Sequence, residues 1–294
     1  MANLRDEIHP FRARRAQTRE AFAGVDGEQI TANVEEQGDV RWLLWRIVTL
    51  MSQRRVELAK TLAALGWQQT EAQQILAHAM ESRGELRSIL LGVPDEYVDM
   101  EPAPGEWSVR QALEHAHGVD ERYMRATEYA VERMHSANEM PIQRPTDGQP
   151  RGEDERLPGN LASVLTRLHT RRDEVIDHLA GIVDEDLTAP VVYRREQVDV
   201  RYRLYLFASH EREHTGQVAR TLRAVGFQQS EAQMILGQAE IGRGVIEGML
   251  IGVPEDLLAS RPPGGLPSVH DILVKAVAHE DGLANSILGA VAGA

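Results

Sequence analysis

The sequence contains no cysteine and few aromatic residues. The absence of cysteine excludes disulfide bonds, thiolate metal ligands and cysteine nucleophiles. Phenylalanine, tryptophan and tyrosine together make up 5% of the chain, and long alternations of β-branched residues are missing, so signals for β-strands are sparse. The longest apolar tail, residues 287–294, is too short to span a bilayer. These absences predict an all-α protein without a membrane-spanning segment.

The charge of the chain bears on its partners. The net charge is −13 at pH 7 and the sequence pI is near 5.3, which disfavours attraction to nucleic acid phosphates. Apolar residues make up 42% of the 294 residues, as in folded domains. The N-terminal segment carries several arginines and lacks the apolar core of a secretory signal. We therefore expect a cytoplasmic protein with no nucleic-acid partner and no membrane partner.

Two segments, residues 39–134 and 199–294, follow one pattern at a constant offset of 160 residues, as from Gly66 to Gly226, and no gap is needed. The matching stretches include Asp39-Val40-Arg41 with Asp199-Val200-Arg201, Gly92-Val93-Pro94 with Gly252-Val253-Pro254, and Ser108-Val109 with Ser268-Val269. A fixed period of this kind predicts an internal duplication, and the length of the chain suits two domains.

Helical periodicity dominates both segments. Apolar residues recur at steps of three and four along residues 40–65, which predicts a helix that ends at Gly66. Capping boxes start the next helices, and prolines mark the ends of two of them. The capping boxes begin at Thr70, Ser108, Ser230 and Ser268, and the prolines are Pro94 and Pro254. Two more helices, at about 8–23 and 160–182, bring the expected number to eight, with a long loop at 136–158.

The order of these helices predicts two bundles of four. Residues 68–227 contain one complete set of four helices, and residues 1–67 together with 228–294 would form a second, degenerate set. An alternative grouping places the first four helices in one bundle and the last four in the other. The sequence alone leaves both arrangements open.

Three histidines occur in only one of the two copies. At the offset of 160 residues, His210 and His214 correspond to Leu50 and Arg54, and His115 corresponds to Lys275. A spacing of four places both His210 and His214 on one helix face, where two imidazoles can bind one divalent ion and a third ligand from another helix leaves a position open. The alternative is a pair of surface histidines on an amphipathic helix.

His115 and His117 lie two residues apart on one predicted helix, about 200° around its axis. Only one of them is therefore expected to point into the bundle. We choose His115 as the third ligand and expect His117 to be solvated. The remaining histidines are expected to be ordinary surface or packing residues.

The combined pattern resembles the DinB-like metal-binding family, the four-helix-bundle superfamily that includes thiol-dependent S-transferases and mycothiol-dependent maleylpyruvate isomerase. The resemblance covers about residues 68–227. It depends on Trp107-Ser108-Val109-Arg110, Leu113 and His115, followed by His210-Glu211-Arg212-Glu213-His214 and Gly216-Gln217-Val218.

The resemblance implies an up-down-down-up four-helix bundle in which His115, His210 and His214 form a metal triad, with the loop 136–158 crossing near the mouth of the site. The family often forms homodimers of this bundle. A chain with a second, degenerate bundle would imitate such a dimer as a monomer, although a homodimer of the whole chain is also open. That second bundle is expected to bind no metal, because Pro267 and Lys275 replace Trp107 and His115.

The leading functional hypothesis is a metal-dependent enzyme that binds Zn²⁺ or Ni²⁺, with Fe²⁺ as a further alternative. Such an ion activates a water or thiol in its open position. The resemblance implies a thiol S-transferase or hydrolase acting on a small molecule, with a low-molecular-weight thiol as cosubstrate. Glu211 is the candidate catalytic residue, which would orient a ligand or carry a proton. The expected position of both Glu211 and Glu213 is nevertheless a solvated helix face.

Two other functions stay open. His210-Glu211 and His214 also fit the zincin metalloprotease signature, with Glu211 as general base and Glu240 as a conceivable third ligand. Zincins present their substrate along a sheet edge, and no strand pattern precedes this helix, which disfavours that hypothesis. The third possibility is a non-catalytic metal-binding scaffold, for example in a stress response.

Overall fold

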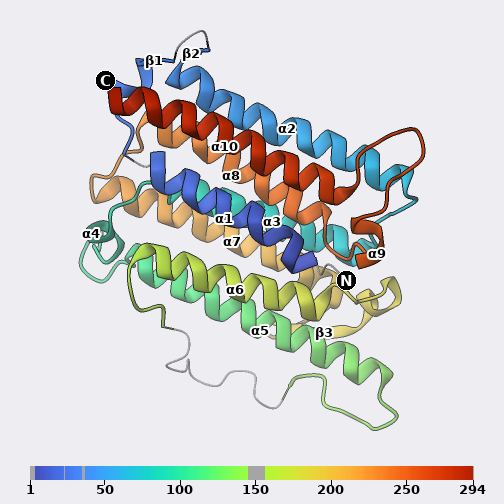
Figure 1. The fold of residues 1–294 in the computed structure, drawn as a ribbon. Helices are drawn as coiled ribbons and strands as arrows, with labels where there is room; N and C mark the ends of the chain where they lie inside the picture. Colours follow the sequence, from blue (N-terminus) through green and yellow to red (C-terminus); the bar gives the residue numbers. More distant parts are fainter. Residues whose placement is uncertain (1–3, 23, 35–36, 145–155, 294) are drawn as a thin grey trace. The chain divides into compact units, whose positions relative to one another are not determined.

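The computed structural model describes residues 4–22, 24–34, 37–144 and 156–293, and this part of the chain is mostly helical (Figure 1). The prediction of an all-α fold is confirmed. The helices are α1 (Leu4–Phe22), α2 (Val40–Ala64), α3 (Glu71–Ile89), α4 (Asp95–Val98), α5 (Val109–His135), α6 (Leu161–Leu179), α7 (Val200–Ala224), α8 (Glu231–Met249), α9 (Glu255–Leu258) and α10 (Val269–Gly293), with 3-10 helices at Gln29–Thr31 and Asp184–Thr188.

Local signals in the sequence fix the ends of these helices. Ser108 and Ser230 form the predicted capping boxes at the starts of α5 and α8. Gly66 follows α2 with a φ of 73°, a left-handed conformation that suits glycine. Pro94 and Pro254 were predicted to mark the ends of α3 and α8. Instead they are the N-cap residues of the short helices α4 and α9. These two short helices were not among the eight expected.

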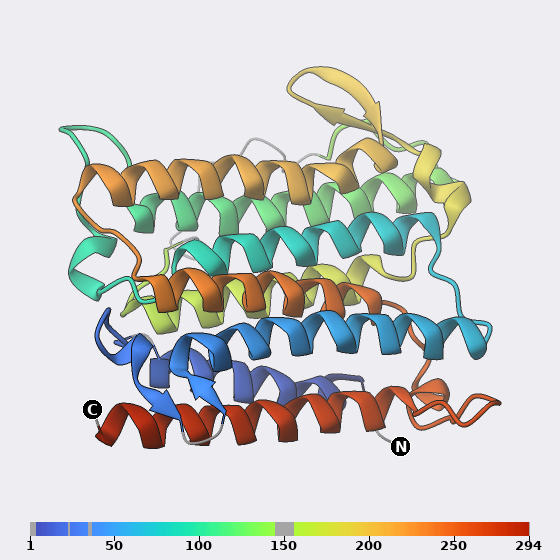
Figure 2. The same ribbon diagram turned by 90° about the horizontal axis from the view of Figure 1, so that it is seen from above.

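Two short antiparallel hairpins contradict the expectation that no strand precedes α7. They pair β1 (Asn33–Val34) with β2 (Gly38–Asp39), and β3 (Pro190–Tyr193) with β4 (Glu196–Asp199). The second hairpin leads directly into α7 and extends to one side of the N-terminal end of this helix (Figure 2). Arg194 and Arg195 form its two-residue turn with φ values of 49° and 73°. Asn and Gly usually occupy such a turn, so two arginines at these positions do not predict a hairpin from the sequence.

The chain divides into two compact units. The first unit contains Met1–Gln68, Gly84–Gly92 and Gln228–Ala294, and the second contains Gln69–Arg83 and Val93–Phe227. Helix α3 is divided between them, because its last turns group with the first unit. In the first unit α2 packs against α8 and α10, and α1 packs against α10.

In the second unit α5 packs against both α6 and α7, and α5 and α6 lie side by side in Figure 1. Helices α5 and α7 run antiparallel, because contacts join opposite ends of the two. Arg133, near the end of α5, donates to the carbonyl of Pro190, ahead of α7. Thr221, near the end of α7, donates to the carbonyl of Trp107, just before α5, over 3.4 Å. The middle of α7 therefore lies beside the middle of α5.

The bounds of the elements repeat at the spacing seen in the sequence. Helices α2 and α7 start at Val40 and Val200 and end at Ala64 and Ala224. The same offset of 160 residues relates α3 to α8 and α4 to α9. Of the predicted loop 136–158, residues 145–155 lie outside the described residues. Among the described residues, every helix is too short or too polar to serve as a membrane span.

Candidate metal centre

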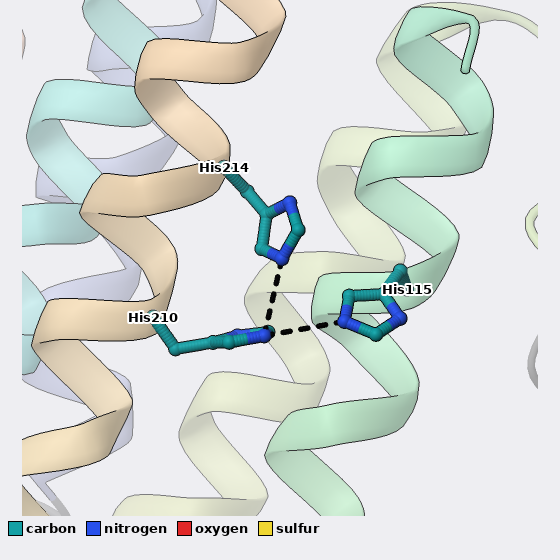
Figure 3. A group of neighbouring side chains, drawn as sticks. All are labelled: His115, His210 and His214. Atoms are coloured by element: carbon teal, nitrogen blue, oxygen red, sulfur yellow. Dashed lines mark hydrogen bonds between the residues drawn. The ribbon is translucent and has the colours of Figure 1, made fainter. Parts of the chain in front are cut away.

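Three imidazole rings converge in the second unit (Figure 3). His210 and His214 extend from one face of α7, and His115 extends toward them from α5. The Nε2 atom of His210 lies 3.2 Å from Nε2 of His115 and 3.1 Å from Nε2 of His214. All three candidate ligand atoms lie within 4.8 Å of one another. The structure thus brings together the three histidines that are predicted as ligands from the sequence.

These separations fit a shared metal ion. With Zn–N bonds of about 2.0–2.1 Å, tetrahedral geometry separates two ligand nitrogens by about 3.3 Å, close to the spacings at His210. The ligands must be neutral to bind. Burial, followed by the charges of His214, His115, Arg122 and Arg194, lowers the pKa of His210 to about 3. His210 is therefore neutral near pH 7.

The tautomer of His214 also suits metal binding. Its Nδ1 atom lies 2.8 Å from Oε1 of Gln217, one turn further along α7. With the amide oxygen as acceptor, Nδ1 must carry the hydrogen. The lone pair of the neutral ring is then on Nε2, the atom that faces His210. Gln217 acts as the outer hydrogen-bond partner that metal-binding histidines commonly have.

Aromatic side chains contact the triad on more than one side. Trp107 contacts His115 and His214, with ring centroids 5.1 Å and 6.2 Å apart. Tyr123 contacts His210 with centroids 5.8 Å apart. These rings limit the motion of the imidazoles and lower the local polarity, which strengthens electrostatic interactions at the site.

A cavity of about 620 Å³ opens beside the triad. His214 and Trp107 line it together with Gln217 and Arg220 of α7. His115 and His210 are not among its lining residues. A small molecule in this cavity would therefore approach the triad past His214.

Comparison with known proteins agrees with this geometry. Residues 78–218, just under half of the chain, match the model of the DinB superfamily. This segment belongs to the DinB superfamily. It contains all three histidines of the triad, so the resemblance seen in the sequence is confirmed.

Among solved structures, this chain is similar to YfiT from Bacillus subtilis, a "probable metal-dependent hydrolase with an unusual four-helix bundle topology". The sequence identity is 15% and the TM-score is 0.42, with 52% of this chain and 87% of that chain covered. The search of curated proteins found no match.

Glu211 of the DinB segment does not lie on a solvated helix face. Its side chain is 2% exposed, and both carboxylate oxygens accept hydrogen bonds. One oxygen accepts from Arg83, and the other accepts from Ser82 at 2.7 Å and from Arg172 at 3.2 Å. The expectation of solvation was wrong for Glu211 because residues of α3 and α6 cover this side of α7. Glu213, two residues later, is exposed as expected.

Glu211 belongs to a buried ion-pair network with two arginines and a second carboxylate. Arg83 and Arg172 both donate to Asp120 as well, over 3.1 Å and 3.0 Å. Burial alone would raise the pKa of Glu211, but the charges of Arg172 and Arg83 hold it below its ordinary value. Burial dominates at Asp120 and raises its pKa. With both oxygens engaged, Glu211 is better suited to fixing the position of α7 than to transferring protons.

His117 is buried, which contradicts the expectation that it is solvated. Its Nδ1 atom has no hydrogen-bond partner among the described residues. Burial, followed by the charges of Arg171 and Arg83, lowers the pKa of His117 to about 4. The expectation failed because α5 packs against both α6 and α7, so two faces of α5 are covered. No residue pattern in the sequence indicates this second covered face of α5.

The third ligand proposed for a zincin site is not part of the cluster. Glu240 belongs to the first unit, where it accepts a hydrogen bond from Arg243 at 2.8 Å. The group that the structure brings together contains His115 instead. In addition, the carboxylate of Glu211 is held by arginines rather than free to act as a general base. These contacts disfavour the zincin hypothesis.

The corresponding positions of the first unit hold other side chains. Leu50 is buried, and Arg54 pairs with Glu57 and lies 2.8 Å from Nδ1 of His279. Lys275 is exposed. Among the residues that the structure describes in this unit, no comparable histidine or carboxylate group was found.

Proposed function

We propose that this chain is a metal-dependent enzyme that acts on a small molecule, with His115, His210 and His214 as ligands of one divalent ion, Zn²⁺ or Ni²⁺. The observation that carries the proposal is the convergence of three Nε2 atoms at the spacing of ligands around one ion. Three protein ligands leave a coordination position for water or substrate, as in catalytic zinc sites. The DinB match of the surrounding residues supports the same conclusion.

The residues around the triad have separate tasks in this proposal. Gln217 holds the tautomer of His214, and Trp107 and Tyr123 cover the imidazoles and limit access of water. The cavity beside His214 admits the small molecule. A divalent ion, when bound, supplies Lewis acidity that makes a water or thiol nucleophilic near neutral pH. The reaction would be a thiol S-transfer or a hydrolysis, and any thiol comes from outside the chain, because the chain has no cysteine.

The first unit is proposed to be a degenerate copy of the second, which makes the chain a pseudo-dimer. Equivalent contacts support a common origin. Thr61 donates to the carbonyl of Pro267 over 3.0 Å, as Thr221 donates to the carbonyl of Trp107. The other repeated pairs are Arg41 with Glu231 and Arg201 with Glu71. The scaffold contacts recur at the offset of 160 residues, whereas the histidines do not.

Metal analysis of the purified full chain tests the proposed ligands. Wild-type protein dialysed against zinc is expected to hold about one ion per chain, and His210→Ala is expected to lose most of it. His78→Ala is the matched control, because His78 is an exposed histidine of the same unit outside the triad. The proposal fails if wild type retains no more metal than His210→Ala.

A second measurement separates an enzyme from a metal-binding scaffold. The protein is loaded with Co²⁺, and its absorption is followed while 2-mercaptoethanol is added. A new thiolate-to-cobalt band is expected if a coordination position is open. A spectrum that does not respond, in protein that holds the ion, would favour the scaffold.

A further inference from the structure

The cavity beside the triad has one arginine in its lining. Arg220 lies on α7, six residues beyond His214, and its side chain is exposed. A Cβ atom built on Gly216 would lie 3.5 Å from Nη1 of Arg220. The guanidinium group is therefore folded back along α7 in the direction of His214. Gly216 has no side chain that would cover this path.

The guanidinium group is available to a ligand. Among the described residues, no ion pair or hydrogen bond involves the Arg220 side chain. Glu106 is the one acidic residue in the lining, and its side chain is exposed. A guanidinium group binds a carboxylate through two parallel hydrogen bonds, a geometry that a neutral group cannot match.

Trp107 gives the cavity lining a flat, apolar surface. Its indole ring also contacts His115 and His214 of the triad. A cavity of about 620 Å³ lies within the range of small-molecule sites. The chain carries a net charge of −13, so its overall field repels anions. Binding of an anion therefore needs a local cation, which Arg220 supplies.

We propose that this cavity binds a small carboxylate-bearing molecule, with its carboxylate paired to Arg220 and its apolar part against Trp107. This inference rests on the proposed function, because it names the substrate class of the same site. The ligand approaches the triad past His214 with one end anchored. Orientation by a fixed anchor is a general way to bring a reactive group to a catalytic centre.

Binding of two probes of matched shape tests the inference. The probes are 3-phenylpropionate and its neutral analogue 3-phenylpropan-1-ol, titrated calorimetrically into the full chain with and without added zinc. Wild type is expected to bind the carboxylate about tenfold more tightly than the alcohol, since charge-assisted bonds are stronger than neutral ones. Arg220→Met is expected to lose this preference, and Arg220→Lys to retain part of it.

Lys60→Met is the matched control. Lys60 is exposed and occupies the position of the first unit that corresponds to Arg220. Lys60→Met removes one positive charge from the chain, as Arg220→Met does, so an effect of net charge alone would appear in both variants. Circular dichroism checks that each variant remains folded.

The outcomes distinguish this inference from the proposed function. Equal affinity of wild type for the two probes, or an unchanged preference in Arg220→Met, overturns the inference whether or not metal is bound. A clear preference for the carboxylate in protein that binds no metal supports the inference and contradicts the proposed metal-dependent function.

Discussion

Replacement of Glu211 by glutamine tests whether the buried network, rather than proton transfer, explains this residue. Glu211→Gln keeps the shape of the side chain and removes its charge. Arg83 and Arg172 would then share Asp120 as their one described acidic partner, and one positive charge would be left unbalanced in the interior. Because an uncompensated buried charge is costly, the second unit should lose about 3–5 kcal/mol of stability.

The assay needs a probe of the second unit alone. Of the four tryptophans, Trp107 is the one that belongs to this unit. Urea unfolding is therefore followed by fluorescence in a background in which the other three, Trp42, Trp45 and Trp67, are phenylalanine. The free energy of unfolding is compared between this background and its Glu211→Gln variant.

Glu213→Gln is the control, because it makes the same chemical change at an exposed position on the same helix. It is expected to change the free energy of unfolding by less than about 0.5 kcal/mol. A Glu211→Gln variant that is as stable as this control would refute the structural role of the buried network. A variant that keeps its stability and bound metal but loses catalysis would instead indicate proton transfer by Glu211.

Three further predictions concern the triad and its surroundings. Gln217→Leu should weaken zinc binding about 10- to 100-fold, since it removes the partner that fixes the His214 tautomer. Competition with a chromogenic chelator measures the zinc affinity, and an unchanged affinity would contradict this role of Gln217. Chelation of bound metal should lower the unfolding temperature of wild type but not of His210→Ala. Calorimetry measures both temperatures, and an equal shift in the two proteins would contradict metal binding by the triad. The pKa of His117 in the folded protein is about 4, below the ordinary value of 6.5, so the unfolded chain binds the proton at a higher pH than the folded chain. The contribution of neutral His117 to the free energy of unfolding is therefore complete above about pH 6.5 and is lost as the pH falls toward 4. His117→Leu should therefore make the urea midpoint less dependent on pH in this range, and an unaltered slope would oppose this assignment.

The helices could be predicted from sequence because their signals are local. The capping boxes at Ser108 and Ser230 and the left-handed Gly66 each depend on a few neighbouring residues. The convergence of His115 with His210 and His214 could be inferred because only one copy of the repeat keeps them. Whether they bind a metal remains a prediction.

What the sequence did not reveal depends on contacts between distant segments. Glu211 is buried because Arg83 and Arg172, far away in sequence, balance its charge. The burial of His117 follows from a second helix against α5, which a helical wheel does not show. The β3–β4 hairpin was missed because its turn is built from Arg194 and Arg195.

The turn between β3 and β4 offers a route to a more robust protein. Left-handed backbone costs roughly 1–2 kcal/mol for each residue that carries a side chain, and Arg194 and Arg195 both adopt it. An Asn-Gly pair suits such a turn with little strain. Arg194→Asn combined with Arg195→Gly should therefore raise thermal tolerance, and it also removes the Arg194 charge that helps to lower the pKa of His210.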